Sequence, residues 1–445
     1  MTSTLFSWPS AAAADTLNDA ALLGALSRFE IALAQEQAAL GLIPSSAAKA
    51  IAAHAGALRL DPSRLACDGA NAGSLAIPFI AALRARIAAH DAAAADWVHF
   101  GTTSQDLLDT ALCLCLRPVV IDVDATLRRA CDAAVSLAQT HRATPMLART
   151  LLQPAGITTF GYKVAQWAHS LATTRKRLAA DTADALAVSL GGALGDLSAY
   201  SDKGDALRAA LARALDLRDP GVSWHTQRER LAGLAASLGI AAGVMAKIAT
   251  DLSLMMQAEV GEASEAQGGG STAMPHKRNP VLSLRVLACT QPLPGLVANL
   301  LAGMAQEHER ALGNWQAEAE QYRMLAHHAL AAAQALAQLL ETVRIDTVRC
   351  RGNIDALRGV IFSEALTALF AGALGKQAAQ SHVAALSARA VEQGQQLRDL
   401  AHGYVDATPE LNSIAPSELD AVFDVARAAQ PSMRATDALL ALTRA

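Results

Sequence analysis

The chain has 445 residues, a formal net charge of −4 and a pI near 6.3, so it offers no general cationic surface to nucleic acid or an anionic membrane. Hydrophobic residues make up 52% of the sequence but aromatic residues only 4%, a balance that favours closely packed Ala/Leu-rich helices over sheets. A chain of this length exceeds the size of one growing core, and we expect an all-α protein with more than one domain.

The N-terminal residues, MTSTLFSWPS, lack the basic start and apolar run of a secretory signal. No apolar stretch is expected to reach the roughly 20 residues that span a bilayer. We therefore predict a cytoplasmic protein with neither a membrane nor a nucleic-acid partner. The cysteines are scattered without a CxxC pair and no HExxH motif occurs, so the sequence predicts no metal and no cofactor.

Residues 1–105 are predicted to form a helical N-terminal domain. The turn residues Gly41 and Pro44 follow a helical pattern of apolar residues, which recur at Leu22, Leu26, Phe29, Leu33 and Leu40. This spacing indicates one amphipathic helix whose apolar side faces a core.

A central domain over residues 106–344 is predicted to be a bundle of long helices, and residues 345–445 a C-terminal helical domain. One helical seam consists of Ile157, Phe160, Val164, Trp167, Leu171, Thr174 and Leu178. A second seam, on a helix predicted from about Gln227 to Glu262, consists of Leu231, Leu234, Leu238, Ala241, Met245, Ile248, Leu252 and Met255. Such alternating steps are typical of coiled-coil-like helices, which need partners along their length. No alternating strand pattern is visible.

Hydroxyl side chains gather ahead of a predicted helix in HFGTTSQDLLDT, His99 to Thr110. Thr103 and Ser104 lie at the point where the apolar helical pattern begins. Hydroxyls and free backbone N–H groups at a helix start bind anions well. Helix capping explains the same residues without any ligand, so these residues by themselves leave both interpretations open.

The strongest functional signal is the string GGGSTAMPHKRNP, Gly268 to Pro280. Successive glycines allow a loop that opens and closes at low steric cost, and Ser271 and Thr272 follow them. Lys277 and Asn279 add a fixed cation and an amide donor, a combination suited to a carboxylate substrate. A phosphate-binding loop would need Gly-Lys-Ser/Thr in direct succession, which is absent here. A solvated basic loop is the plain alternative.

This string resembles the signature loop of the fumarase/aspartase superfamily, whose pattern is Gly-Ser-Ser/Thr-x-Met-Pro-x-Lys-x-Asn-Pro. The resemblance implies that Ser271 is the catalytic base and that Lys277 and Asn279 hold a substrate carboxylate. It makes Thr272, the second hydroxyl of the pair, a candidate substrate-binding residue. HFGTTSQD resembles the first signature of the same superfamily. This second resemblance implies that Thr103 and Ser104 contact a substrate carboxylate.

ARTLLQPAG, Ala148 to Gly156, is similar to a second signature, which in adenylosuccinate lyases contains a histidine that helps to protonate the leaving amine. This chain has Leu151 at that position. Elimination of an amine is disfavoured, because a poor leaving group needs a proton donor, whereas a carboxylate leaving group does not. Gln153 can still donate a hydrogen bond to a substrate oxygen.

Two further strings, WHTQRER and QEHERALGNW, resemble bacterial 3-carboxy-cis,cis-muconate cycloisomerases within that superfamily. The resemblance makes His225 and Arg310 candidate substrate-binding residues. Packing beside Trp224 is an alternative role for His225, and pairing with a neighbouring glutamate is an alternative for Arg310. No residue of these strings is expected to bind a metal.

The resemblance implies an all-α enzyme of three helical domains whose central bundle forms a homotetramer with active sites shared between subunits. It implies a small polycarboxylate substrate and no cofactor. The expected reaction is cyclisation of 3-carboxy-cis,cis-muconate to carboxymuconolactone, a step in protocatechuate breakdown by the β-ketoadipate pathway. The alternatives are a related lyase, such as adenylosuccinate lyase releasing fumarate, and a non-catalytic helical scaffold.

Overall fold

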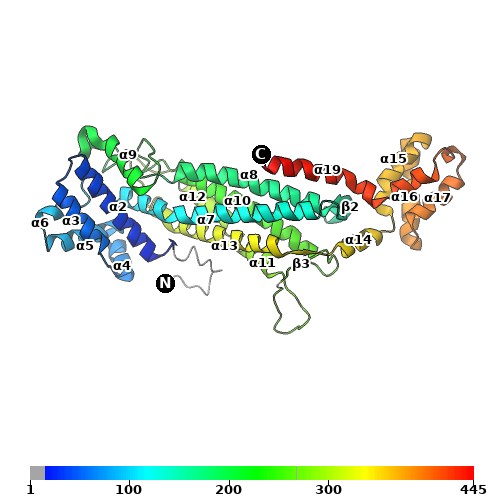
Figure 1. The fold of residues 1–445 in the computed structure, drawn as a ribbon, viewed down its shortest axis with the longest axis horizontal. Helices are drawn as coiled ribbons and strands as arrows, with labels where there is room; N and C mark the ends of the chain where they lie inside the picture. Colours follow the sequence, from blue (N-terminus) through cyan, green and yellow to red (C-terminus); the bar gives the residue numbers. More distant parts are fainter. Residues whose placement is uncertain (1–15, 267, 445) are drawn as a thin grey trace. The chain divides into compact units, whose positions relative to one another are not determined.

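The protein is described here by a computed structural model, which covers residues 16–266 and 268–444 (Figure 1). The N-terminal string MTSTLFSWPS lies outside the described residues. The chain divides into two compact units, and each unit takes three separate segments. The first unit comprises Met1–Leu127, Thr174–Ala246 and Arg285–Ala335, and the second comprises Arg128–Thr173, Lys247–Leu284 and Leu336–Ala445. The domain boundaries expected at residues 105 and 344 stay a prediction.

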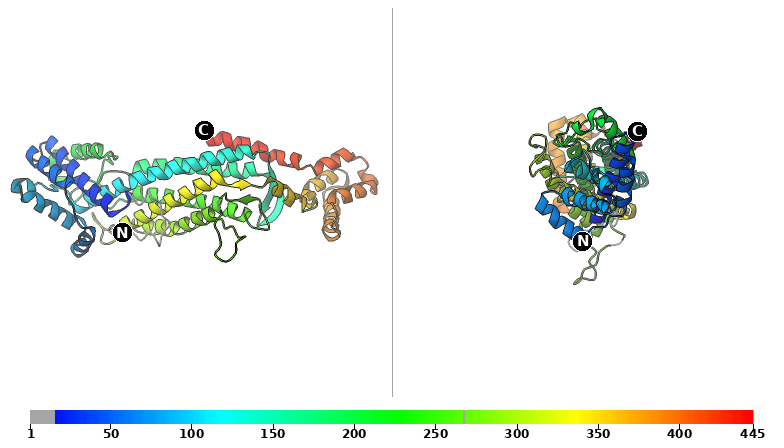
Figure 2. Two further views of the ribbon diagram at one scale, coloured as in Figure 1. Left: turned by 60° about the horizontal axis from the view of Figure 1, so that its bottom comes forward. Right: turned by 90° about the vertical axis from the view of Figure 1, so that its left-hand side faces the viewer.

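The long helices of the chain each contribute a stretch to both units. They are α7 (Ser104–Thr140), α8 (Phe160–Ala185), α10 (Glu229–Met255) and α13 (Glu318–Thr342). Within each unit these stretches lie side by side (Figures 1 and 2). In the first unit, Arg175 of α8 donates to Asp124 of α7 at 2.9 Å. In the second, Trp167 of α8 donates to Asp251 of α10 at 3.1 Å. The predicted bundle of long helices is confirmed.

The first unit also contains a set of shorter helices. Asn18 caps the first of them, α2, by accepting a hydrogen bond from the Ala21 N–H at 2.8 Å. The predicted N-terminal amphipathic helix is therefore present. The shorter helices are α2 (Asp19–Ala39), α3 (Ser45–Gly56), α4 (Pro62–Ala72), α5 (Ala76–Ala88), α6 (Ala92–Ala95), η2 (Ser198–Lys203), α9 (Gly204–Leu215) and α12 (Leu293–Ala302).

The second unit contains a β-hairpin and a cluster of C-terminal helices. The helices are α14 (Thr347–Asp355), η3 (Val360–Phe362), α15 (Ser363–Leu374), α16 (Lys376–Gln393), α17 (Leu397–Asp406), η4 (Pro409–Leu411), α18 (Pro416–Val422) and α19 (Val425–Arg444). Leu366, Phe370, Val383 and Leu397 are among the residues of a buried core that α15, α16, α17, η4 and α18 share. Helix α11 (Val281–Thr290) follows the signature loop and divides between the two units.

The chain contains a few short strands, although no alternating strand pattern is visible in its sequence. Strands β1 (Pro145–Thr150) and β2 (Gln153–Thr159) pair antiparallel, and the short strands β3 (Ala263–Ser264) and β4 (Arg344–Ile345) form a second pair. Ile157 therefore belongs to β2 and not to the helical seam, which begins at Phe160. β1 and β2 are too short, and too mixed in burial, to give a clear alternation in the sequence.

The seam of α10 is buried throughout, from Leu231 to Met255, as predicted. The helix ends at Met255, earlier than the predicted Glu262. Gly261 adopts a left-handed φ of 64°, and its N–H donates to the Gln257 carbonyl at 2.7 Å. Glycine takes this conformation without steric cost. Glu262 is thereby released to pair with Arg149 at 2.7 Å.

Within residues 16–266 and 268–444, two helical stretches are long and apolar enough to cross a membrane, judged by length and composition only. They are Glu229–Met255, with a mean hydropathy of 1.7, and Val281–Ala302, with 1.4. The expectation that no stretch reaches this length is wrong. Apolar residues occupy exposed as well as buried positions here, as at Ile240 and Leu301, which are 42% and 47% exposed.

Candidate active site

The loop before α7 carries the predicted carboxylate-binding hydroxyls in the first unit. His99 anchors this loop to α2 through Glu30, with 2.6 Å between Nδ1 and the carboxylate. Burial lowers the pKa of His99. The Glu30 carboxylate raises this pKa by more than burial lowers it, so the pKa lies above its ordinary value. Helix α7 begins at Ser104, and Thr103 lies directly before it. Thr103 is buried and Ser104 is half-buried.

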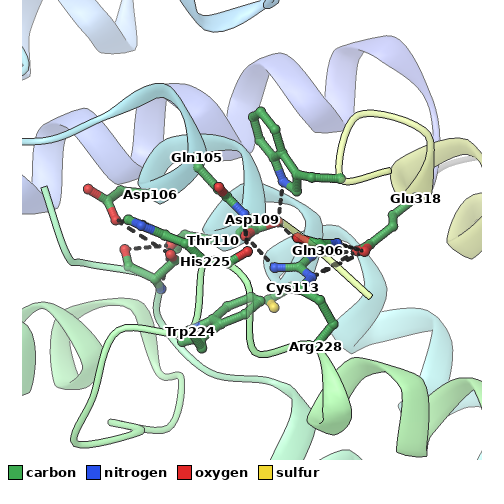
Figure 3. Close-up of polar contacts among 12 residues, drawn as sticks. Gln105, Asp106, Asp109, Thr110, Cys113, Trp224, His225, Arg228, Gln306 and Glu318 are labelled. Carbon is green, nitrogen blue, oxygen red and sulfur yellow. Dashed lines mark hydrogen bonds and ion pairs between the residues drawn. The ribbon is translucent and has the colours of Figure 1, made fainter. Parts of the chain in front are cut away.

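His225 lies beneath this loop and contacts the first turn of α7. Its Nε2 is 2.7 Å from an oxygen of Asp106 (Figure 3). Gln105 donates to the His225 backbone carbonyl at 2.6 Å. The Nδ1 atom is buried and has no hydrogen-bond partner among the described residues. The side chain is thus held from one edge, with the other nitrogen left for a ligand or a water molecule.

Arg228, from the same string as His225, is committed to structure. It donates to Asp109 at 2.7 Å and to Glu318 at 2.5 Å (Figure 3). Burial lowers the pKa of Arg228. The two carboxylates raise this pKa by more than burial lowers it, so the pKa lies above its ordinary value. Its guanidinium also lies over the Trp224 ring, 4.8 Å from the ring centroid. Arg228 is therefore fully paired with structural partners within the first unit.

Arg310 lies against the loop at Gly192 and Ala193. It donates to their carbonyls at 3.4 Å and 3.0 Å. Its Nε atom is buried without a hydrogen-bond partner among the described residues. A guanidinium held in this way by carbonyl groups keeps donor capacity for a carboxylate.

The signature loop belongs to the second unit and is closed at its base by two contacts. Gly269 and Asn279 exchange backbone hydrogen bonds at 2.9 Å and 2.8 Å. Glu265, just before the loop, accepts the backbone N–H groups of Leu282 and Ser283 at 2.9 Å each. These N–H groups belong to the first turn of α11, where a carboxylate is favoured.

The Ser271 hydroxyl oxygen accepts two backbone N–H groups within the loop. The donors are Ala273 at 3.3 Å and Met274 at 3.1 Å. Donors of this kind stabilise negative charge on the serine oxygen. Thr272 and Lys277 are exposed, and the Asn279 amide donates to the Gly270 carbonyl at 3.2 Å.

Gln153 is exposed at the start of β2, directly after the hairpin turn formed by Leu151 and Leu152. These leucines have positive φ angles of 51° and 65° and are 97% and 75% exposed. A left-handed backbone is unfavourable for leucine, and so is full exposure of its side chain. The hairpin therefore presents strained apolar residues beside the candidate polar one.

The predicted site residues divide into two sets. Those of the first unit are Thr103, Ser104, His225 and Arg310, and those of the second are Gln153, Ser271, Thr272, Lys277 and Asn279. Sequence interpretation gave no role to Asp106, Asp109 or Glu318. Asp106 is the last residue of the HFGTTSQD string, and Asp109 lies one turn later on the same buried helix face. Across residues 16–266 and 268–444, no group of three or more His, Cys, Asp or Glu is arranged to hold a metal ion.

The helical fold and the signature loop define the class of protein. A family model described as "Lyase" matches residues 13–290, and the chain belongs to this lyase family. It is 41% identical to a 3-carboxy-cis,cis-muconate cycloisomerase of Bradyrhizobium diazoefficiens over 93% of this chain and 92% of the relative.

Two further relatives are similar along nearly their whole length. The crystal structure of 3-carboxy-cis,cis-muconate lactonizing enzyme from Pseudomonas putida matches with a TM-score of 0.91 and 34% identity, covering 100% of this chain and 99% of that one. A nitrosuccinate lyase of Streptomyces davaonensis is 38% identical over 92% of this chain and 88% of the relative.

Proposed function

We propose that the protein is a cycloisomerase that converts 3-carboxy-cis,cis-muconate to carboxymuconolactone. Relatives of that name align with nearly the whole chain at 41% and 40% identity. The observation that carries the proposal is the geometry at Ser271, whose oxygen accepts two backbone N–H groups at the head of the signature loop. The sequence string around it also contains the lysine and the asparagine that a carboxylate substrate needs.

In the proposed reaction, one substrate carboxylate attacks the conjugated double bond of the same molecule. A proton is delivered to the carbon alpha to another carboxylate. Ring closure within one molecule removes most of the entropic barrier, so the enzyme chiefly orients the substrate and stabilises charge. Thr103, Ser104, Lys277 and Asn279 are suited to hold the carboxylate on which enolate-like charge develops.

Ser271 exchanges the proton in this proposal. A serine hydroxyl is a weak acid, and its oxyanion needs nearby donors if it is to form during turnover. The N–H groups of Ala273 and Met274 are such donors, and the exposed Lys277 adds a cation to the same loop. Gln153, Thr272, His225 and Arg310 complete the set of proposed substrate contacts.

The proposed assembly is a homotetramer in which different subunits contribute to each active site. Exposed apolar residues support it, because large uncovered apolar side chains on long helices favour burial against another copy. They are Ile240 and Leu254 on α10, Leu284 on α11, Leu301 on α12, and Leu151 and Leu152 at the hairpin turn. We place this assembly in the cytoplasm and assign it no cofactor.

Substitutions of Leu151 test whether the leaving group of the reaction is a carboxylate or an amine. The leaving group of the reverse reaction is a tethered carboxylate that needs no protein acid, so we expect Leu151→Met to retain most lactonising activity. Leu151→His should lower that activity by placing a polar group against the forming lactone. Leu152→His, on the same turn, is the matched control and should have the smaller effect. Steady-state rates of lactone formation measure all three.

Ultraviolet absorbance gives the direct test of the function. The substrate is a conjugated tricarboxylate and the lactone has lost part of that conjugation, so absorbance should fall on addition of enzyme. Release of AMP from adenylosuccinate at about 1 s⁻¹ or faster would instead make the protein an adenylosuccinate lyase. Nitrosuccinate belongs in the same panel, since a relative at 38% identity carries that activity in its name. Turnover of none of the three would favour the scaffold alternative.

A further inference from the structure

The Asp106 carboxylate joins separate segments of the first unit. One oxygen accepts the Gly191 N–H at 2.8 Å and lies 2.7 Å from His225 Nε2. The other accepts the N–H groups of Thr103 at 3.0 Å and Gly192 at 2.9 Å. The residue is 0% exposed. Figure 3 shows it facing His225 at the first turn of α7.

Three of these partners are backbone N–H groups, which can only donate, so the arrangement suits an ionised carboxylate, which accepts at both oxygens and donates nothing. Hydrogen bonds from backbone N–H groups to an ionised carboxylate are stronger than those between neutral groups. One planar group with two fixed oxygens therefore sets the separation between the Thr103 backbone and the Gly191–Gly192 backbone. A capping residue needs only the first of these contacts.

The segments that Asp106 joins approach each other closely. A Cβ atom on Gly192 would lie 2.9 Å from the Gly101 carbonyl oxygen, and Gly192 has a φ of 75°. On its other side, the Gly192 carbonyl accepts a hydrogen bond from Arg310. Asp106 consequently contacts the Thr103 backbone and the His225 side chain directly, and it reaches Arg310 through Gly192.

We propose that Asp106 is a positioning residue that fixes Thr103, His225 and the carbonyl support of Arg310 in the arrangement that receives a substrate carboxylate. The part of this proposal that concerns a substrate carboxylate rests on the proposed function. The part that concerns the positions of Thr103, His225 and the support of Arg310 does not. Asp106 does not contact the substrate and acts through the backbone it holds.

Asp106→Asn is the test variant because it changes charge and donor pattern without changing shape. In either orientation of the amide, an NH₂ group replaces an oxygen that accepts at least one backbone N–H group. It would face Thr103 and Gly192 in one orientation, and Gly191 and His225 in the other. The matched control is Asp124→Asn, on the same helix, which removes the carboxylate that accepts two hydrogen bonds from Arg175 at 2.9 Å and 3.0 Å.

Hydrogen exchange without substrate separates positioning from general stability. In Asp106→Asn, peptides containing Thr103 and Gly191–Gly192 should both exchange faster than in the wild type, whereas Asp124→Asn should leave them unchanged. The value of kcat/KM for lactone formation should fall about 10²-fold in Asp106→Asn, the order expected for misplaced binding groups, and remain near wild type in the control. Unchanged exchange at either segment, or an equal loss of activity in both variants, would overturn the proposal.

A measurement on the wild type covers the case in which Asp106→Asn does not fold. On binding of propane-1,2,3-tricarboxylate, the peptides containing Thr103 and Gly191–Gly192 should become protected together. Protection of only one of them would contradict a common anchor. If the wild type does not lactonise the substrate, the proposed function fails, and the exchange of the substrate-free variants still decides the role of Asp106.

Discussion

Ser271→Ala should lower the turnover of lactone formation by about 10² or more while leaving the thermal unfolding temperature close to that of the wild type. The hydroxyl oxygen is the atom that the Ala273 and Met274 N–H groups support, and alanine removes it. Stability should change little, because Ser271 is only half-buried in a loop whose base is closed by Glu265, Gly269 and Asn279. Stopped or continuous absorbance assays with purified variants give the rate, and calorimetry gives the unfolding temperature.

Thr272→Ala is the matched control for Ser271→Ala. Both residues lie at the head of the loop, but Thr272 is exposed and its predicted role is substrate binding. Its loss should raise KM more than it lowers kcat. A near-normal turnover number for Ser271→Ala would remove Ser271 as the proton-exchanging group and move the search to another residue of the loop.

Met245→Asp should unfold the chain, whereas Ile240→Asp should leave it folded and disrupt the proposed assembly. Met245 is 0% exposed within α10, so an aspartate there would be a buried unpaired charge costing several kcal/mol. Ile240, on the same helix, is 42% exposed, and an aspartate at that position stays solvated in the separate subunit. Circular dichroism measures folding, and sedimentation measures assembly.

This pair of variants separates burial within one subunit from burial between subunits, because the apolar spacing in the sequence does not distinguish the two. Met245 and Ile248 lie mid-seam and are both buried within the chain, so replacing them would destabilise the fold and not the assembly alone. A wild-type protein that sediments as a single subunit would contradict the homotetramer. An Ile240→Asp variant that keeps the size of the wild type would place the subunit contact elsewhere.

The long helices were predictable because a buried helix face leaves a period in the sequence. Each residue of the second seam, from Leu231 to Met255, is buried as its spacing predicted. The helix end was not predictable from that period. After Met255 the backbone turns back, so that the Glu262 N–H donates to the Met255 carbonyl at 2.9 Å, and Glu262 pairs with Arg149, which is far away in the sequence. The hairpin of β1 and β2 was missed for a related reason, since its strands are short and its turn consists of leucines.

The sequence by itself determined the all-α class, the lyase family and the residues whose chemistry suits a carboxylate substrate. These features are readable because helical period and the signature string are local in the chain. Only the tertiary structure showed that Arg228 is held by Asp109 and Glu318, and that Asp106 joins Thr103, Gly191, Gly192 and His225. A buried charge needs partners, and the tertiary fold decides which groups lie close enough to pair with it. The sequence around an aspartate does not indicate which donors its carboxylate will accept.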